Sequence, residues 1–153
     1  MTKEEIRAMW VNKLHTALQD VEKGPSPAQL DDAPELSFWR PYISQHGCPL
    51  LVGFVMGHVR LHDGWIRTSQ LIALNSIQGW ARTASRWYRL GQTLSELEES
   101  LAESFEIKSA SNIYAEHNVP GFRPLDDTEA LSLLLSAWHD RINREFKETK
   151  QNG

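Results

Sequence analysis

Four arginines and two aromatic residues in the middle of the sequence have side chains that suit a binding surface. They are Arg60, Arg67, Arg82, Arg86, Trp65 and Tyr88. Guanidinium groups contact phosphate oxygens and aromatic rings stack on bases, so this composition is typical of nucleic-acid contacts. It is equally typical of an interface with another protein, where arginine and tryptophan are enriched. A third, structural interpretation is that the arginines pair with acidic side chains on the protein's own helices.

The charge distribution supports a local anion-binding role without choosing between these interpretations. The chain has a net charge of -4, yet residues 58–90 contain five arginines and a single acidic residue, Asp63. A basic region within an acidic protein suits a nucleic acid, another anion or an acidic protein patch.

Residues 50–91 must position these side chains, and their pattern predicts an antiparallel meander of three strands. Asp63-Gly64 is typical of a two-residue hairpin turn, because such turns need residues that tolerate positive φ. This turn would place Arg60 opposite Arg67 on the solvent-facing side. In the third strand, residues 80–91, Arg82 and Arg86 would point the same way, together with Tyr88. The second turn has four or five residues, so whether the four arginines share one face stays open.

The remaining segments predict helices and a loop around this sheet. Thr2 and Glu5 have the spacing of a capping box before an apolar stripe that ends at Gly24, which predicts a helix over residues 1–23. Residues 24–49 are rich in proline and polar residues and predict a loop-rich segment. Similar boxes at Thr93 and Glu96 and at Asp126 and Glu129 predict an acidic helix over residues 93–107 and a C-terminal helix over residues 126–148. The expected fold is a single α+β domain spanning residues 1–153.

The acidic helix is a second candidate site. Glu96, Glu99 and Glu103 would form a row of carboxylates, which can imitate a nucleic-acid backbone and occupy a basic groove. The more ordinary alternative is a solvated helix face.

The histidines and the single cysteine are weaker candidates for a metal-binding or catalytic site. His58 and His62 flank the hairpin turn, and His46 and Cys48 lie nearby in the sequence. Two histidines and a cysteine can ligate zinc, but no paired metal motif, phosphate loop or dinucleotide fingerprint accompanies them. We therefore expect no metal and no cofactor, and we keep an enzyme that uses His58 or His62 as an alternative.

The cellular location expected from the sequence is the cytoplasm. No apolar run is long enough to span a membrane, and the first residues, MTKEEIRAMW, lack the apolar core of a signal peptide. A single cysteine cannot form an internal disulfide.

The block from Gly57 to Gly91 carries a resemblance to a known family. It reads G-H-x-R-L-x-D-G-x-I-x-T-S-x-L-I-A-L, a short turn, and W-A-R-T-x-S-R-W-Y-R-L-G. This block resembles an uncharacterised bacterial family known mainly from proteobacteria, and the resemblance implies no activity.

We expect a non-enzymatic recognition or regulatory protein that binds a macromolecular partner, either a protein or a nucleoprotein complex. An inhibitor encoded by a phage or other mobile element, of the anti-CRISPR type, is one such protein. The alternatives are a nucleic-acid-binding protein that uses the Arg-rich sheet, and the enzyme described above.

Overall fold

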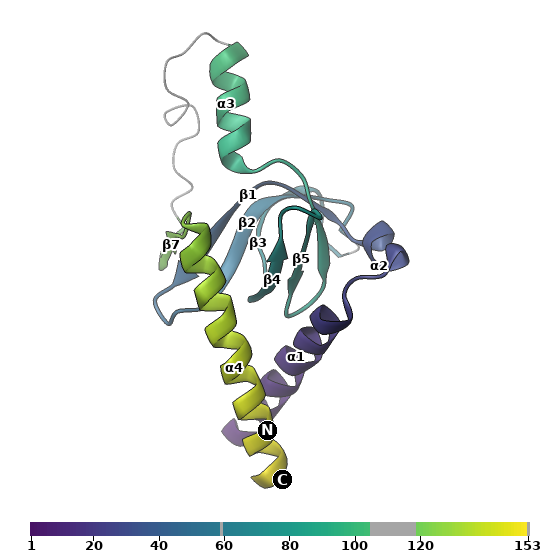
Figure 1. The fold of residues 1–153 in the computed structure, drawn as a ribbon, viewed down its shortest axis with the longest axis vertical. Coiled ribbons are helices and arrows are strands. Elements are labelled where there is room, and N and C mark those ends of the chain that lie inside the picture. Colours follow the sequence, from purple (N-terminus) through teal and green to yellow (C-terminus); the bar gives the residue numbers. More distant parts are fainter. Residues whose placement is uncertain (59, 105–118, 153) are drawn as a thin grey trace.

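Helices stand at both ends of the chain and strands fill its middle (Figure 1). The computed structural model describes residues 1–58, 60–104 and 119–152. In chain order the elements are α1 (Lys3–Lys23), α2 (Pro27–Asp32), β1 (Glu35–Ser44), β2 (Pro49–Met56), β3 (Gly64–Arg67), β4 (Leu71–Asn75), β5 (Trp80–Thr83), β6 (Trp87–Leu90), α3 (Leu94–Ser104), β7 (Phe122–Pro124) and α4 (Thr128–Asn152).

The strands form one mixed sheet in the order β3-β2-β1-β6-β5-β4, with β7 added to β1. β1 runs parallel to β6, and the other neighbours are antiparallel. The predicted α+β class is confirmed. The predicted three-stranded meander is too small, because it omits β1 and β7 and joins strands that are separate.

β1 lies in the segment that the sequence predicts to be loop-rich, residues 24–49, so that prediction is wrong for residues 35–44. The prolines of this segment led to the prediction of a loop in place of the strand. Pro41 pairs with Leu51 of β2, although proline lacks the N–H that a strand normally donates. Its carbonyl accepts from Leu125 N at 2.9 Å, so the backbone of Pro41 faces away from β2. The missing N–H therefore removes no β1–β2 hydrogen bond.

The predicted two-residue turn at Asp63-Gly64 is also wrong. β2 ends at Met56 and β3 begins at Gly64, so residues 57–63 connect them. Asp63 takes part in this longer connection by accepting from Gly57 N at 3.2 Å through Oδ1. The predicted return strand is divided into β3 and β4. Between them, Thr68 Oγ1 accepts from Leu51 N at 3.0 Å and donates to Ser69 O at 2.8 Å.

The helices agree best with the sequence. Thr2 Oγ1 accepts from Glu5 N at 3.1 Å at the start of α1, and Gly24 ends this helix with a φ of 78°, as predicted. α3 follows the predicted cap Thr93, whose Oγ1 accepts from Glu96 N at 3.1 Å. Residues 105–107 of the predicted acidic helix lie outside the described residues.

α4 begins two residues later than predicted and continues to Asn152. Its cap is Asp127, whose Oδ1 accepts from Glu129 N and Ala130 N. The predicted cap, Asp126, instead pairs with Arg40 of β1.

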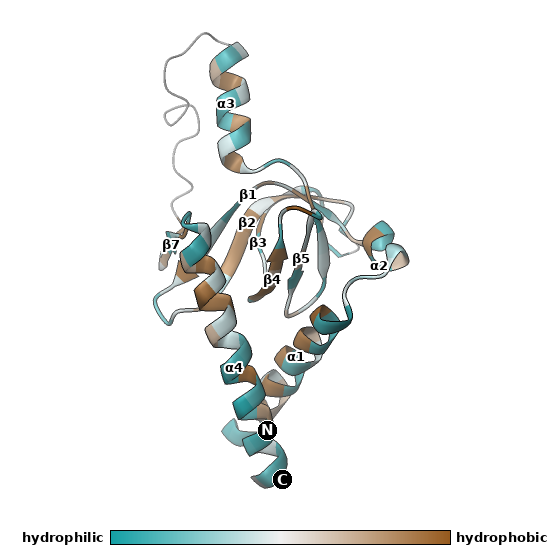
Figure 2. Cartoon of the chain, in the orientation of Figure 1, coloured by the Kyte–Doolittle hydropathy of each residue, from teal (hydrophilic) through white to brown (hydrophobic). Residues whose placement is uncertain are grey.

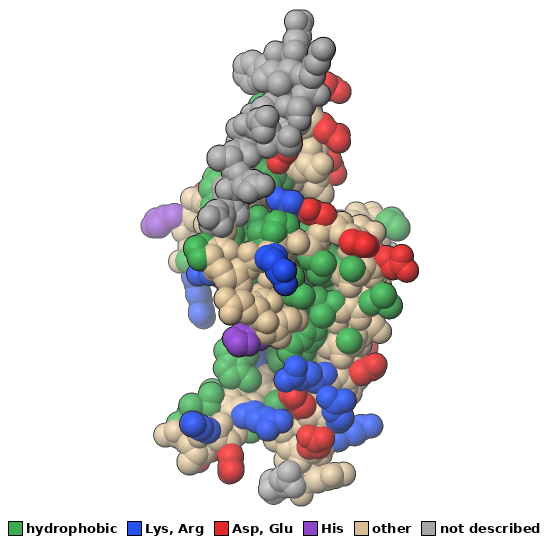
Figure 3. Space-filling view, turned by 90° about the vertical axis from the view of Figure 1, so that its left-hand side faces the viewer, with side chains coloured by type: hydrophobic (Ala, Val, Ile, Leu, Met, Phe, Trp, Pro, Cys, Tyr) green, Lys and Arg blue, Asp and Glu red, His purple; other side chains and the backbone are tan. Residues whose placement is uncertain are grey.

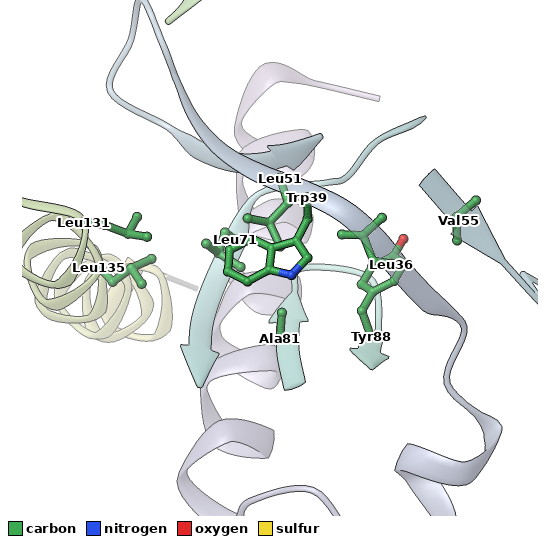
Figure 4. Packing of buried hydrophobic residues seen from close by; sticks show 9 residues of the cluster. All are labelled: Leu36, Trp39, Leu51, Val55, Leu71, Ala81, Tyr88, Leu131 and Leu135. Carbon is green, nitrogen blue, oxygen red and sulfur yellow. The ribbon is translucent and has the colours of Figure 1, made fainter. Parts of the chain in front are cut away.

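The main core lies between the sheet and the first half of α4, which carries most of the helix's hydrophobic residues (Figure 2). Its residues are Leu36, Trp39, Leu51, Val55, Leu71, Ala81, Tyr88, Leu131 and Leu135 (Figure 4). α1 packs beside the second half of α4, where the rings of His15 and Phe146 stack with centroids 3.5 Å apart. Within the described ranges, no helix has an apolar stretch long enough to cross a membrane.

Candidate functional site

Arg82 does not belong to an exposed surface. Its side chain lies between the sheet and α1, only 8% of the residue is exposed, and Nη2 donates to Asp20 Oδ2 at 2.8 Å. The guanidinium also lies over the ring of Trp87, 5.6 Å from its centroid. For this arginine the structural interpretation holds: it pairs with an acidic residue of the protein's own helix.

The predicted third strand, residues 80–91, is a tight hairpin, and this explains where its side chains go. β5 and β6 pair with Arg82 opposite Trp87, and Thr83 N donates to Arg86 O at 2.9 Å to close the turn between them. Arg82 is therefore in a strand and Arg86 is in the turn, so the two do not share a strand face as predicted.

Tyr88 is buried as well, at 4% exposure within the main core. Burial raises the pKa of its hydroxyl, and the positive charge of Arg86 opposes part of that rise. Tyr88 is thus a core residue rather than the exposed anchor that the sequence suggested.

Three of the predicted residues remain at the surface, namely Arg60, Trp65 and Arg67. Arg67 faces Val52 across the β2–β3 pair and not Arg60, since Arg60 lies in the connection of residues 57–63. The guanidinium of Arg67 stands over the ring of Phe122, 5.4 Å from its centroid. The four arginines thus occupy four different settings and do not share one face.

Trp65 belongs to a group of aromatic side chains that we call the aromatic platform, made of Phe38, Phe54 and Trp65. Phe54 pairs directly with Trp65, and their rings meet edge to face at 5.8 Å. The ring of Phe38 lies 6.4 Å from that of Trp65. Because side chains alternate along a strand, Phe54 points away from the core that contains its neighbour Val55.

Phe38 reaches the platform through an unusual backbone conformation. β1 has an irregularity in its register between Ser37 and Arg40, and Phe38 inside it has a φ of 55°. Non-glycine residues rarely adopt positive φ, and such strain persists only where the surrounding structure holds it. Phe38 is not predicted from the sequence, because it lies in the segment predicted to be a loop. The signal for Phe54 was present, since Val52, Phe54 and Met56 alternate along one face of β2.

His58 has a structural task in the connection between β2 and β3. Its Nδ1 accepts from Arg60 N at 3.0 Å and from Leu61 N at 3.3 Å, which requires an unprotonated Nδ1. Burial lowers the pKa of His58, and the positive charges of Arg86 and Arg60 lower it further. His62 is exposed. Within residues 1–58, 60–104 and 119–152, no group of three His, Cys, Asp or Glu side chains is placed to hold a metal ion.

Glu96, Glu99 and Glu103 are all exposed on α3 and form the predicted acidic row. Their spacing of three and four residues places them on one helix face. Figure 3 shows acidic side chains following α3 at the edge of the view, well away from the Lys and Arg side chains near the lower helices.

The comparison with known families covers nearly the whole chain, because one family matches residues 1–150. The chain belongs to the family of unknown function DUF6634. The DUF6634 match includes α1 and most of α4, so the shared unit extends well beyond the block of residues 57–91. No curated protein and no solved structure matches the chain.

This DUF6634 protein therefore presents two groups of side chains, each of one chemical kind: the partly exposed aromatic platform on the sheet and the exposed acidic row on α3. The first combines apolar area with Arg67 nearby, and the second carries only negative charge.

Proposed function

We propose that the protein is a recognition protein that binds a partner protein through the aromatic platform and thereby regulates that partner. The observation that carries the proposal is the exposure of Trp65, at 40%, in contact with two further aromatic rings on the side of the sheet away from the α4 core. Large aromatic side chains are the residues that most often dominate binding energy at protein interfaces.

The platform has the form expected of an interface centre. Each aromatic side chain offers roughly 150–250 Å² of surface at a small loss of conformational entropy. Met56 and Leu61, which are also exposed, extend the apolar composition in the neighbouring strand end and connection. Arg60 and Arg67 supply positive charge, so the expected partner surface combines an apolar pocket with acidic side chains around it.

Phe38 adds a second line of support. A positive φ at a bulky residue costs about 1–3 kcal/mol, and here it accompanies the placement of one more ring beside Trp65. Strained backbone of this kind is concentrated at binding and active sites.

A single-stranded nucleic acid is the second candidate, favoured by the same rings together with Arg60 and Arg67. Stacking of bases on Trp65 would resemble known single-strand platforms. The burial of Arg82 and Tyr88 weakens this candidate, because two of the proposed contacts are used inside the protein. The two candidates differ in salt dependence, since counterion release makes nucleic-acid binding fall steeply as salt rises.

The proposal is tested by affinity capture from bacterial lysate with the wild-type chain, Trp65→Ala and Trp10→Ala. Trp10 is a matched control, because it is a 52% exposed tryptophan on α1, far from the platform in the sequence. We expect a stoichiometric protein complex with wild type and Trp10→Ala that is lost with Trp65→Ala. Equal capture by all three proteins would contradict the proposal. Labelled DNA or RNA that binds in a salt-dependent manner and is lost with Trp65→Ala would favour the second candidate.

A further inference from the structure

A pocket of about 550 Å³ lies where the starts of α3 and α4 meet the middle of β1. Its volume is within the range of roughly 300–1,000 Å³ that is usual for small-molecule sites. None of the three platform residues is among the described residues that line it. The pocket is therefore a separate feature from the proposed partner surface.

The walls of the pocket have an apolar part and a polar part. The apolar part is formed by Trp39, Pro41, Leu74, Leu94, Leu125 and Leu131. Trp39 is held in place because its Nε1 donates to Gly91 O at 3.0 Å. A fixed aromatic side chain surrounded by leucines suits the apolar body of a small organic molecule.

One ion pair at the pocket wall is already satisfied. Arg40 donates through Nε to Asp126 Oδ1 at 2.9 Å and through Nη2 to Asp126 Oδ2 at 2.6 Å. This two-bond arrangement neutralises both charges. Arg40 is therefore engaged and does not act as an anion receptor.

Glu98 supplies the one uncompensated charge among the described lining residues. It lies half-buried on α3, and no described side chain forms an ion pair or a hydrogen bond with its carboxylate. A carboxylate that is partly removed from water is stabilised by a cation placed beside it.

Protein oxygens reduce the attraction of the two helix starts for anions. N–H groups at a helix start attract anions when they are free. Here Thr93 Oγ1 accepts from Glu96 N, and Asp127 Oδ1 accepts from Glu129 N and Ala130 N. The protein's own oxygens thus occupy three of the N–H groups at these helix starts.

We propose that this pocket binds a small organic amine, with the apolar body against Trp39 and the leucines and the ammonium group at the Glu98 carboxylate. A carboxylate forms charge-assisted hydrogen bonds with an alkylammonium ion, and the aromatic ring with the leucines accommodates the apolar body. A ligand that carried a carboxylate would bring like charge to Glu98 and would be disfavoured.

The test uses three probes of similar size and different charge: phenethylamine, phenethyl alcohol and 3-phenylpropionate. Each is titrated into ¹⁵N-labelled full-length protein, and binding is read from the indole N–H signal of Trp39 and the amide signals of Ser95 and Thr128. The Trp39 signal is assigned by its loss in Trp39→Phe. Titrations are repeated with Glu98→Gln and with Glu99→Gln, a matched control whose exposed side chain does not line the pocket.

We expect phenethylamine to bind best, to lose at least about tenfold in affinity with Glu98→Gln, and to change less than about twofold with Glu99→Gln. Trp65→Ala should leave amine binding unchanged, which separates this inference from the proposed function. Equal binding of the amine and the alcohol, preferred binding of 3-phenylpropionate, no response at Glu98→Gln, or no perturbation of the Trp39 signal by any probe would each overturn the proposal.

Discussion

The positive charge of Arg82 is buried in the protein, where Asp20 of α1 is its ion-pair partner. The Nε and Nη1 atoms of Arg82 are buried, and no described residue accepts a hydrogen bond from them. The charge therefore depends strongly on the ion pair of Nη2 with Asp20, in addition to the contact with the ring of Trp87. Breaking a buried ion pair by removing one partner is costly, because the other charge is left unpaired.

Replacement of Asp20 tests this dependence. We expect Asp20→Asn to lower the free energy of unfolding by about 1–3 kcal/mol, less than for a fully buried pair because Asp20 is partly exposed. In an Arg82→Met background the same substitution should cost little, since no buried guanidinium remains. Urea unfolding of the wild type, the two single variants and the double variant measures the coupling. Additive losses would show that Asp20 does not neutralise Arg82.

Asp126 offers a test at one titratable residue. Its hydrogen bonds with Arg40 lower the pKa of its carboxyl group below the usual value of 3.8. A lowered folded-state pKa contributes stability that is present above the unfolded pKa and is lost as pH falls through the folded pKa.

Asp126→Asn should therefore destabilise the protein at neutral pH and have little effect at pH values below the folded-state pKa of Asp126. The difference should be no more than about 1 kcal/mol, because the Asp126 side chain is 61% exposed and water screens the pair. Urea unfolding of both proteins as a function of pH measures it, with Glu99→Gln as a control for the loss of an exposed carboxylate. A difference from wild type that is the same at neutral pH and in acid would contradict the assigned role of the Arg40 pair.

Among the elements, β1 determines whether the platform exists, because its irregularity carries Phe38. At ordinary strand positions glycine is less stable than alanine. At Phe38, with a φ of 55°, we expect the reverse order. Phe38→Gly should be more stable than Phe38→Ala by about 1 kcal/mol, because only alanine retains the steric cost of positive φ.

Thermal or urea unfolding of these two variants measures the difference, and Phe54, an ordinary position of β2, provides the comparison. Phe54→Gly should be less stable than Phe54→Ala. If alanine were favoured at both positions, Phe38 would not be strained.

The sequence predicted elements whose signals are local. Capping at Thr2 and Thr93 located α1 and α3, because a cap and an apolar stripe lie within a few residues of each other. β1 was missed because Pro41 is tolerated only through the placement of neighbouring strands, which the local pattern does not report. The hairpin inside residues 80–91 was missed because its turn lacks glycine, asparagine and proline and depends on the Thr83 and Arg86 backbone.

For the candidate site too, only the residues with local sequence signals were predicted correctly. Trp65, Arg67 and the acidic row were predicted as exposed side chains and are exposed. Arg82 and Tyr88 were not recognised as interior residues, because their burial depends on α1 and on the core, far away in the sequence. Phe38 joins the platform only through long-range pairing of β1 with β2.

Across the whole molecule, we assign separate tasks to separate regions. α1 and α4 support the sheet, and Arg82 joins the sheet to α1. The face of the sheet away from the α4 core carries the aromatic platform. The pocket at the starts of α3 and α4 has its own ligand chemistry. This separation implies that partner binding and amine binding respond to different substitutions.

Partner binding by the aromatic platform is tested most directly by the affinity of the purified, captured partner for wild type, Trp65→Ala and Trp10→Ala. The affinity is measured at low and at near-physiological salt. We predict a loss of at least about tenfold for Trp65→Ala, as for a residue that dominates interface binding energy, and little change for Trp10→Ala, with moderate salt dependence. Unchanged affinity for Trp65→Ala would contradict binding by the platform. A loss confined to Trp10→Ala would also contradict it and would place the binding surface on α1.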